Sequence, residues 1–215
     1  MIATIILPNI KTFKLCLFNV SMAFFFFSFH VHEKTILIPL LGVGLSIRYL
    51  GFYYLDFVTF ASMSMFYLFR YDLMDLQYFV ATCFFWYFCN KMLKLLDSMK
   101  FLKKLSLKKY ENKDSGAFVK LKEENFVKIL LKSIQFIDKL YFKWVRYLFY
   151  GLVVVLHGFE RFITPPPHLP GLWFWFIDIL AFFVFGIIWV RSNLYLFYLV
   201  AKSNLNEKRI EKKMD

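Results

Sequence analysis

The sequence predicts an all-α protein: a polytopic bundle of five or six transmembrane helices, with a basic amphipathic helix on the matrix or cytosolic side. Hydrophobic residues make up 60% of its 215 positions and aromatic residues 22%, whereas soluble globular chains are about 45–50% apolar. A soluble domain of this size buries only about two-thirds of its surface, so these side chains need lipid as their solvent. The abundance of aromatic residues excludes an intrinsically disordered chain, and three cysteines are too few for a secreted disulfide scaffold.

Runs of about 20 mainly apolar residues, which cross about 30 Å of hydrocarbon as a helix, mark the spans. The first covers residues 13–31 and has four consecutive phenylalanines near its centre. Because no small-residue cleavage site follows this run, we expect it to stay in the protein and not to be removed as a signal peptide. Further spans are predicted at residues 78–96, 144–162 and 172–190.

The stretch from residue 35 to residue 69 is harder to divide. As a helix it would extend about 52 Å at about 1.5 Å per residue, which is too long for one straight span and too short for two complete spans with a turn. Three glycines and two charged residues interrupt it. We expect one main span near residues 50–69, preceded by a short tilted or re-entrant segment over residues 35–47. A tight hairpin of two short helices is the alternative.

The charges gather in two segments that orient the chain. Residues 91–143 carry fourteen lysines against six acidic residues, a net +8 of the total +12, and residues 202–215 carry five basic against three acidic residues. The connection at residues 164–171 has no lysine or arginine. Since basic loops stay on the side of negative potential, the central loop and the C-terminus are predicted on that side. The chain then divides into N-terminal transmembrane helices (1–97), a basic amphipathic region (98–143), a C-terminal transmembrane hairpin (144–201) and a basic polar tail (202–215).

An amphipathic helix is predicted within the basic region, continuing into the span that begins at residue 144. Apolar residues recur there at steps of three and four: Val127, Leu130, Ile134, Ile137, Tyr141, Trp144 and Leu148. Such a helix either lies on an anionic membrane surface, where each basic residue contributes about 1 kcal/mol, or docks on a partner. The candidate lipid or partner surface consists of the lysines between the apolar positions: Lys128, Lys132, Lys139 and Lys143.

Charged residues inside predicted spans are the candidate functional positions, because a charge in lipid costs several kcal/mol unless it is paired or hydrated. They could form a proton path or ion pairs that fix helix contacts, and we prefer ion pairs. The candidate residues are Arg48, Asp56, Glu160 and Asp178. Arg48 and Asp56 are eight residues apart, which predicts one shared helix face. His157 lies one turn before Glu160, a spacing that we interpret as a local hydrogen bond in preference to a metal site.

The sequence offers no pattern for a bound cofactor or for catalysis. Four histidines cannot supply the several histidine-rich boxes of membrane di-iron enzymes. The three cysteines lie inside predicted spans. Their spacing fits neither a zinc ribbon nor a redox dithiol. The sequence also lacks a Walker loop, a dinucleotide fingerprint, a zincin motif and a nucleophile elbow. We therefore predict no catalytic residue, no cofactor and no metal, and, without a nucleic-acid-binding module, no nucleic acid.

The amino-acid usage resembles that of hydrophobic inner-membrane proteins encoded in protist mitochondrial genomes, those of ciliates especially. Lysine outnumbers arginine by 21 to 6, and thirty phenylalanines stand against seven alanines, a balance that A/T-rich codons favour. The resemblance, one of composition and span layout, implies a non-catalytic subunit, accessory or divergent core, of a respiratory-chain complex that supports assembly and electron transport. It also implies the mitochondrial inner membrane, a central loop and C-terminus in the matrix, and other membrane subunits and anionic lipids such as cardiolipin as partners.

Two alternative functions stay open at this point. A proton-translocating or transporter subunit, in the membrane arm of complex I or in ATP synthase, would use Asp56, Asp178 and Glu160. An endoplasmic-reticulum membrane protein would use Lys212 and Lys213, which match a dilysine retrieval pattern.

Overall fold

The computed structural model describes residues 8–27, 33–108 and 122–214, and over these residues the protein is helical without strands, which confirms the all-α prediction. Two of the described helices are long and apolar enough to cross a membrane: α2 and the part of α10 from Leu172 to Asn204. They correspond to the first and last predicted spans. The elements in chain order are α2 (Ile10–Phe27), the 3-10 turn η1 (Glu33–Ile36), α3 (Leu37–Leu45), α4 (Ile47–Leu50), α5 (Phe52–Ser64), α6 (Phe66–Tyr71), α7 (Asp75–Lys108), α8 (Lys122–Leu140), the π-helix η2 (Tyr141–Val145), α9 (Arg146–Phe162) and α10 (Leu172–Met214).

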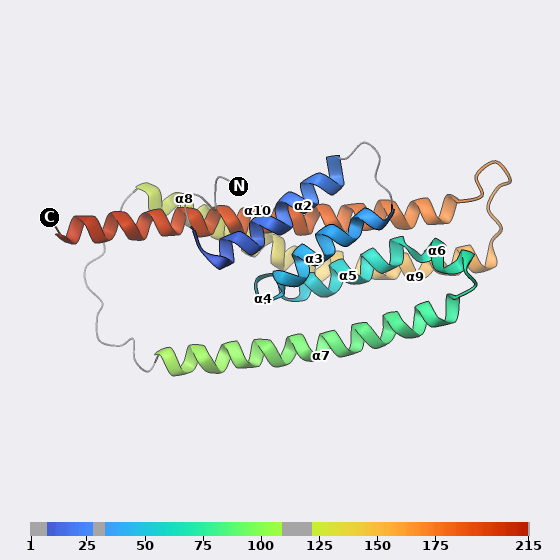
Figure 1. Cartoon of the computed structure of the whole chain (residues 1–215), viewed down its shortest axis with the longest axis horizontal. Coiled ribbons are helices and arrows are strands. Elements are labelled where there is room, and N and C mark those ends of the chain that lie inside the picture. The colour runs from blue at the N-terminus through green and yellow to red at the C-terminus, as the bar shows by residue number, and fades with distance from the viewer. Residues whose placement is uncertain (1–7, 28–32, 109–121, 215) are drawn as a thin grey trace.

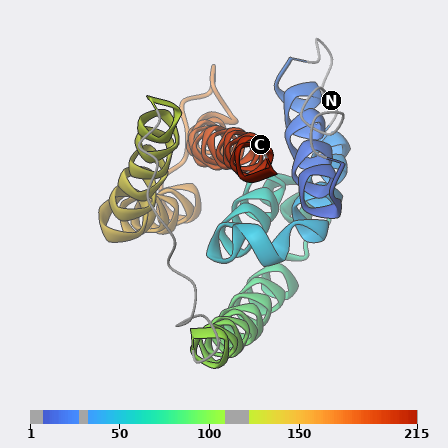
Figure 2. The same cartoon turned by 90° about the vertical axis from the view of Figure 1, so that its left-hand side faces the viewer.

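The long helix α10 forms the axis of the molecule (Figure 1). Viewed from its left-hand end, α2 and α3 lie on one side of α10 and α8 and α9 lie on the other (Figure 2). α10 contacts α2, α5, α8 and α9, whereas α7 lies outside this group and contacts α5 and α6. The core between these helices is rich in aromatic side chains, and it includes Phe18, Phe57, Phe60, Phe185 and Ile188.

The stretch from residue 35 to residue 69 folds back on itself at Gly51. This glycine has φ of 59°, a left-handed backbone conformation that residues with a Cβ avoid. The chain reverses there, so that α3 and α4 run one way and α5 and α6 the other (Figure 1). α3 packs on α5, as in the hairpin alternative. The segment has no straight helix across Gly51, and Arg48 and Asp56 therefore lie on different helices.

The amphipathic helix α8 continues through η2 into α9, but its apolar stripe does not. Leu130, Ile134 and Tyr141 are buried as predicted. Trp144 and Leu148, predicted on the same stripe, are 66% and 61% exposed. The π-helix η2 has a wider turn than the α-helix, so it rotates the following residues relative to α8. The expected stripe is therefore wrong beyond Tyr141.

The helices run across all three predicted boundaries of the chain. α7 passes through residue 97, η2 through residue 143 and α10 through residue 201. The predicted division follows the polarity of the sequence, whereas hydrogen bonding continues a helix through a change of polarity. The division by polarity stays a prediction.

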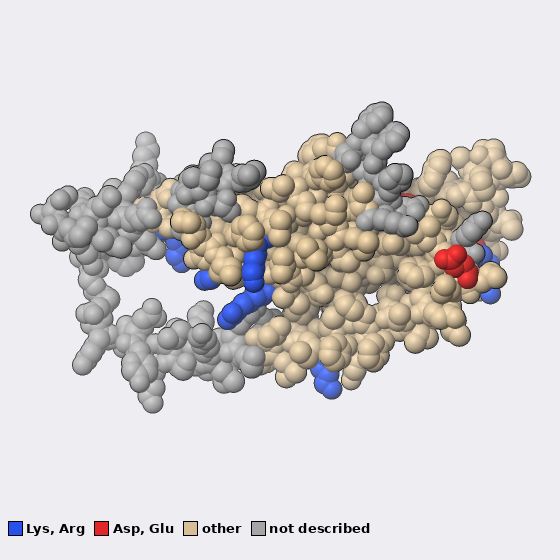
Figure 3. Space-filling view, viewed as in Figure 1, with Lys and Arg blue, Asp and Glu red and all other residues tan. Residues whose placement is uncertain are grey.

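The outer surface of the described helices is largely apolar. Phe24, Leu41, Phe84 and Val154, on four different helices, are each at least 60% exposed. In Figure 3 an almost charge-free band lies between basic residues toward the left and a mixed charged group at the right-hand end. Monomeric soluble proteins rarely expose contiguous apolar patches of more than a few hundred Å², so this surface suits contact with lipid.

The helices α2 and α3 approach each other closely at Gly42. A Cβ added to Gly42 would lie 2.9 Å from the Phe18 Cα and 3.1 Å from the Ser21 Oγ. The first of these neighbours is backbone and can move only with its helix. The absence of a side chain at residue 42 therefore sets the distance between the two helices.

We expect Gly42→Ala to destabilise the protein by about 1–3 kcal/mol relative to its control, the usual cost of overpacking. The control is Gly44→Ala on the same helix, where the added Cβ would meet only the Tyr54 ring at 4.0 Å. Both variants gain the same helix propensity, so thermal unfolding in detergent compares the packing alone. Equal stability of the two variants would contradict the close contact.

Candidate functional site

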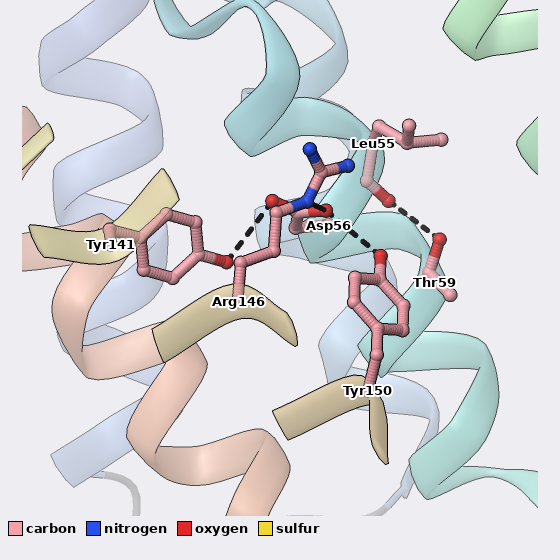
Figure 4. A network of polar contacts seen from close by, with 6 residues as sticks. All are labelled: Leu55, Asp56, Thr59, Tyr141, Arg146 and Tyr150. Carbon is pink, nitrogen blue, oxygen red and sulfur yellow. Dashed lines mark hydrogen bonds and ion pairs between the residues drawn. The ribbon is translucent and has the colours of Figure 1, made fainter. Parts of the chain in front are cut away.

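Asp56, one of the predicted charged positions, lies at the centre of the bundle on α5 and is 0% exposed. Its Oδ1 accepts a hydrogen bond from the Arg146 Nε at 2.9 Å and from the Tyr150 hydroxyl at 2.8 Å. Its Oδ2 accepts a hydrogen bond from the Tyr141 hydroxyl at 3.1 Å. Figure 4 shows the three donors converging on the carboxylate. The charge of Asp56 is thus paired and hydrogen-bonded inside this chain.

The three donors face α5 together because of the π-helix. Tyr141 and Arg146 are five residues apart and span η2, where one turn takes more residues than in an α-helix. Arg146 and Tyr150 are four residues apart in α9, which is about one α-helical turn. All three side chains therefore lie on one face. In a continuous α-helix, Tyr141 would point away from the other two.

A second carboxylate extends the network to α10. Asp138 on α8 accepts hydrogen bonds from the Tyr53 hydroxyl at 2.8 Å and from the Arg191 Nε at 3.1 Å. The Arg191 guanidinium carbon lies 4.9 Å from the centre of the Tyr53 ring. The Tyr53 ring stacks on the Tyr141 ring with centroids 4.8 Å apart. Two aromatic rings therefore connect the two ion pairs, and the network joins α5, α8, η2, α9 and α10.

The charges and hydrogen-bond acceptors of this network are satisfied within the network. Each carboxylate has an arginine and at least one tyrosine hydroxyl as donors, so positive and negative charges balance. The Arg146 guanidinium also lies 5.8 Å from the centres of the Phe52, Phe142 and Tyr150 rings. Asp56, which is 0% exposed and surrounded by its three donors, has no free face for a substrate. We interpret the network as a device that fixes helix positions.

The other predicted charged residues lie elsewhere. Arg48 is exposed on α4. Glu160 on α9 forms an ion pair with Arg70 on α6. Asp178 on α10 lines a cavity of about 240 Å³ together with Tyr67. The structure does not bring the four predicted residues into one site.

An open cavity of about 650 Å³ lies between α6, α7 and α9. Aromatic side chains form much of its wall, and charged side chains lie at its border. The aromatic residues are Phe66, Tyr78 and Phe79, and the charged ones include Arg70, Asp75 and Glu160. This cavity, and not the Asp56 network, has the space and the exposed polar groups that a ligand needs.

His157 lies in the wall of this cavity. Its Nδ1 contacts the Val153 carbonyl oxygen at 2.9 Å, so in the neutral ring Nδ1 carries the proton and donates. Its Nε2 is buried and has no hydrogen-bond partner. Among the described residues no group of three or more potential metal ligands occurs, and Glu160 bonds to Arg70. A shared metal at His157 and Glu160 therefore has no support in the geometry.

Residues 1–191 match the sequence model of the ALG6, ALG8 glycosyltransferase family. The chain belongs to this family. It is 33% identical over 180 residues to the "Probable dolichyl pyrophosphate Man9GlcNAc2 alpha-1,3-glucosyltransferase" of Dictyostelium discoideum. This alignment covers 79% of this chain and 31% of that protein. The dolichyl pyrophosphate Man9GlcNAc2 alpha-1,3-glucosyltransferases of Saccharomyces cerevisiae and Gallus gallus are 27% identical over 209 residues and 28% identical over 198 residues.

The chain of this ALG6, ALG8 family member spans about a third of the length of these curated relatives. The yeast alignment covers 94% of this chain and 36% of the yeast protein, and the chicken alignment covers 86% of this chain and 36% of the chicken protein. No solved structure matches the chain.

Membership of the ALG6, ALG8 family overturns the resemblance to mitochondrial proteins. The predicted function, a respiratory-chain subunit that supports electron transport, is wrong. The predicted location, the mitochondrial inner membrane with a matrix-side loop, is wrong as well. The predicted partners are wrong too, since the named relatives are glucosyltransferases and not subunits of a respiratory complex in a cardiolipin membrane. The physical reason is that an excess of phenylalanine and lysine reflects codon usage and a lipid environment. Neither of these specifies a compartment or a complex.

Sequence reasoning missed the partners of the predicted acids. Arg146 lies inside the predicted span of residues 144–162, and Arg191 directly follows the last predicted span, which ends at residue 190. An arginine in lipid needs a counter-charge, so this signal is present in the sequence. Arg70 and Asp75 lie between predicted spans, and no sequence pattern connects them with His157.

We expect Asp56→Asn to destabilise the protein by about 3–5 kcal/mol, the usual cost of leaving one charge of a buried ion pair alone. The cost arises because the Arg146 guanidinium, with a side chain 13% exposed, loses its counter-charge. Unfolding by heat or denaturant in detergent measures the loss.

Asp138→Asn is the comparison variant: it leaves Arg191, with a side chain 11% exposed, without its counter-charge, but the Asp138 side chain is 32% exposed, so water can reach the altered site. We expect it to cost less than Asp56→Asn, because the Asp56 side chain is 0% exposed and no water can take its place. The double variant Asp56→Leu with Arg146→Met is expected to recover much of the lost stability, since both charges are then absent. Equal losses for Asp56→Asn and Asp138→Asn would show that the buried pair does not organise the bundle.

Proposed function

We propose that this chain is part of the membrane domain of an enzyme that transfers glucose, in α-1,3 linkage, to an oligosaccharide on dolichyl pyrophosphate. The observation that carries the proposal is the match of residues 1–191 to the ALG6, ALG8 glycosyltransferase family. The three relatives are named for this reaction with Man9GlcNAc2 as the oligosaccharide. Since the chain spans about a third of their length, we assign to it a part of the enzyme and not the whole reaction.

For the compartment we propose the endoplasmic-reticulum membrane, which the family relationship favours over the mitochondrion. A dolichyl chain anchors the oligosaccharide acceptor in a bilayer. An enzyme for this acceptor must therefore present its site close to the hydrocarbon, and a helix bundle with an apolar outer surface fits this requirement.

We further propose five or six membrane spans. Five would be α2, the pair α5 and α6, α7, η2 with α9, and α10, and the short pair α3 and α4 would be the sixth. α9 alone has 17 residues, and η2 extends it by five, which supports a complete crossing. α8 and the C-terminal end of α10 lie at the end of the molecule opposite the connection between α9 and α10 (Figure 1). By the charge asymmetry of the sequence, we propose that the end with α8 is cytosolic.

The division by polarity, with a basic region at residues 98–143 and a tail at residues 202–215, belongs to the same proposal. It follows the sides of the membrane and not the ends of helices. The lysine face of α8 and η2 would lie at the cytosolic surface, where it contacts lipid headgroups or a partner. Its four side chains are all exposed: Lys128, Lys132, Lys139 and Lys143.

We propose that the charged residues of the spans hold helices together and do not conduct protons. Asp56 is closed off by its three donors, and Glu160 is paired with Arg70 across α6 and α9. A proton path needs a continuous series of exchangeable groups, and these two acids belong to separate clusters. Arg48 and Asp178 stay candidates for ion pairing within the complete enzyme.

Disruption of the gene that encodes this chain tests the proposed reaction. We expect the source cells to accumulate the unglucosylated oligosaccharide on dolichyl pyrophosphate and to lose the glucosylated forms. Chromatography of the oligosaccharides released from the lipid fraction measures both. Re-expression of the intact gene is the control and is expected to restore glucosylation. An unchanged oligosaccharide profile in the disrupted cells would refute the proposal.

A further inference from the structure

An apolar groove of about 390 Å³ lies between the end of α8, η2 and α10. Its described lining residues are aliphatic or aromatic apart from one glycine, and they include Leu140, Tyr141, Val145, Phe183, Gly186 and Val190. A Cβ added to Gly186 would meet nothing within 4 Å, so the groove is open at this residue. Burial of an apolar chain against such a wall is favourable, because it removes apolar surface from water.

Two lysines lie beside this groove. Lys139 directly precedes Leu140, which lines the groove, and Lys143 lies two residues before Val145, which lines it as well. Both lysines are exposed. Their flexible side chains can bring the ammonium groups to the border of the groove while these groups stay in water.

An exposed tryptophan indicates the depth of the lysine pair in the membrane. Trp144 is 66% exposed, and the Lys143 Nζ lies 5.5 Å from the centre of its ring. Tryptophan side chains prefer the headgroup level of a bilayer. The groove therefore begins near the headgroups, at the end of the molecule with α8.

The groove has a charged end and an apolar end. Asp138 forms an ion pair with Arg191, and these two residues adjoin Lys139 and Val190 in the chain. The Val190 end of the groove therefore lies at the level of Lys139, and since Arg191 balances the charge of Asp138, the lysines leave this end positive. From Val190 the groove extends along α10 to Phe182, which is about 12 Å at about 1.5 Å per residue.

We propose that this groove binds one acyl chain of a diacyl phospholipid, whose phosphate contacts Lys139 and Lys143. A phosphate and a lysine ammonium form a charge-assisted hydrogen bond, and the buried acyl chain adds the hydrophobic contribution. A neutral lipid lacks the first interaction, and a soluble phosphate lacks the second. The site goes beyond the proposed reaction, because it requires only that the end with α8 lies at a membrane surface.

A bound acyl chain would also support the Asp56 network. The Tyr141 ring lines the groove, and its hydroxyl donates to Asp56. Val145, which lines the groove as well, directly precedes Arg146, the ion-pair partner of Asp56. Because a ligand that binds only the folded state stabilises it, the phospholipid would stabilise the arrangement of η2 against α10.

Thermal unfolding of the purified full chain in detergent tests the site, with dioleoylphosphatidylcholine or dioleoylglycerol as the added lipid. The two lipids share their acyl chains and differ in the phosphocholine group. At a concentration well above its dissociation constant, the phospholipid is expected to raise the unfolding temperature by about 5 °C. We expect dioleoylglycerol, which has no phosphate, to raise it by about half as much or less.

A groove-filling variant locates the bound chain. We expect Gly186→Leu to abolish the shift that the phospholipid causes, because the added side chain occupies the groove. Gly151→Leu on α9 is the matched control, since a Cβ added there also has nothing within 4 Å, and it is expected to keep the full shift. Each variant is compared with itself without lipid, so a change in its own stability does not affect the result.

The double variant Lys139→Gln with Lys143→Gln tests the phosphate contact. We expect it to lower the shift from the phospholipid to the shift from dioleoylglycerol. Lys128→Gln with Lys132→Gln is the control, because it removes the same charge from the lysine face farther from the groove. The first described lining residue, Ile137, lies five positions after Lys132, so the control is expected to keep the full shift.

Equal shifts from the two lipids in the unmodified chain would overturn the proposal, and so would a shift that survives Gly186→Leu, because the lipid would then bind elsewhere. A groove that holds a second copy of the chain would instead give a dimer in light scattering that Gly186→Leu abolishes, and this result would overturn it too. The gene disruption is a separate test. A phospholipid-specific shift with an unchanged oligosaccharide profile would keep this site and reject only the proposed reaction.

Discussion

A carboxylate buried among apolar helices must be paired, and the pairing of Asp56 organises much of this structure. Its donors Tyr141, Arg146 and Tyr150 are 85 to 94 residues away in the sequence. They reach it only if α5 packs against η2 and α9, so the ion pair specifies one arrangement of these helices. The Asp138–Arg191 pair extends the constraint to α10. A charge in a medium of low dielectric is very costly alone and much less costly when it is matched, and this contrast makes the arrangement specific.

The outside of the bundle obeys the opposite rule. Large apolar side chains are exposed on α2, α3, α7 and α9, while the network of charges lies inside. Between these two environments lies the cavity at His157, which has an apolar wall and two unsatisfied acceptors. Such a boundary suits a molecule with an apolar part and a polar part, because the first prefers hydrocarbon and the second prefers hydrogen bonds.

The amino-acid composition indicated a lipid environment for this chain but did not identify its family. The abundance of phenylalanine and lysine describes a membrane protein made from particular codons, and many unrelated membrane proteins share it. The family is recorded in the order of residues, which aligns over residues 1–191 with glycosyltransferases. The charges illustrate the same limit. The lysines of α8 and η2 were predictable as an exposed face, whereas nothing in their number indicated the ALG6, ALG8 family.

The sequence by itself determined where the described helices are apolar and where positive charge gathers, because hydropathy and periodicity are local properties. The apolar run at residues 172–190 lies in α10, and the predicted stripe of α8 is buried as far as Tyr141. Only the tertiary structure decided that Asp56 pairs with Arg146 and not with Arg48. The turn at Gly51 separates Arg48 from Asp56, and η2 rotates Arg146 toward α5. A π-helix breaks the period of 3.6 residues on which sequence reasoning relies, so the choice of partner depended on contacts between distant segments.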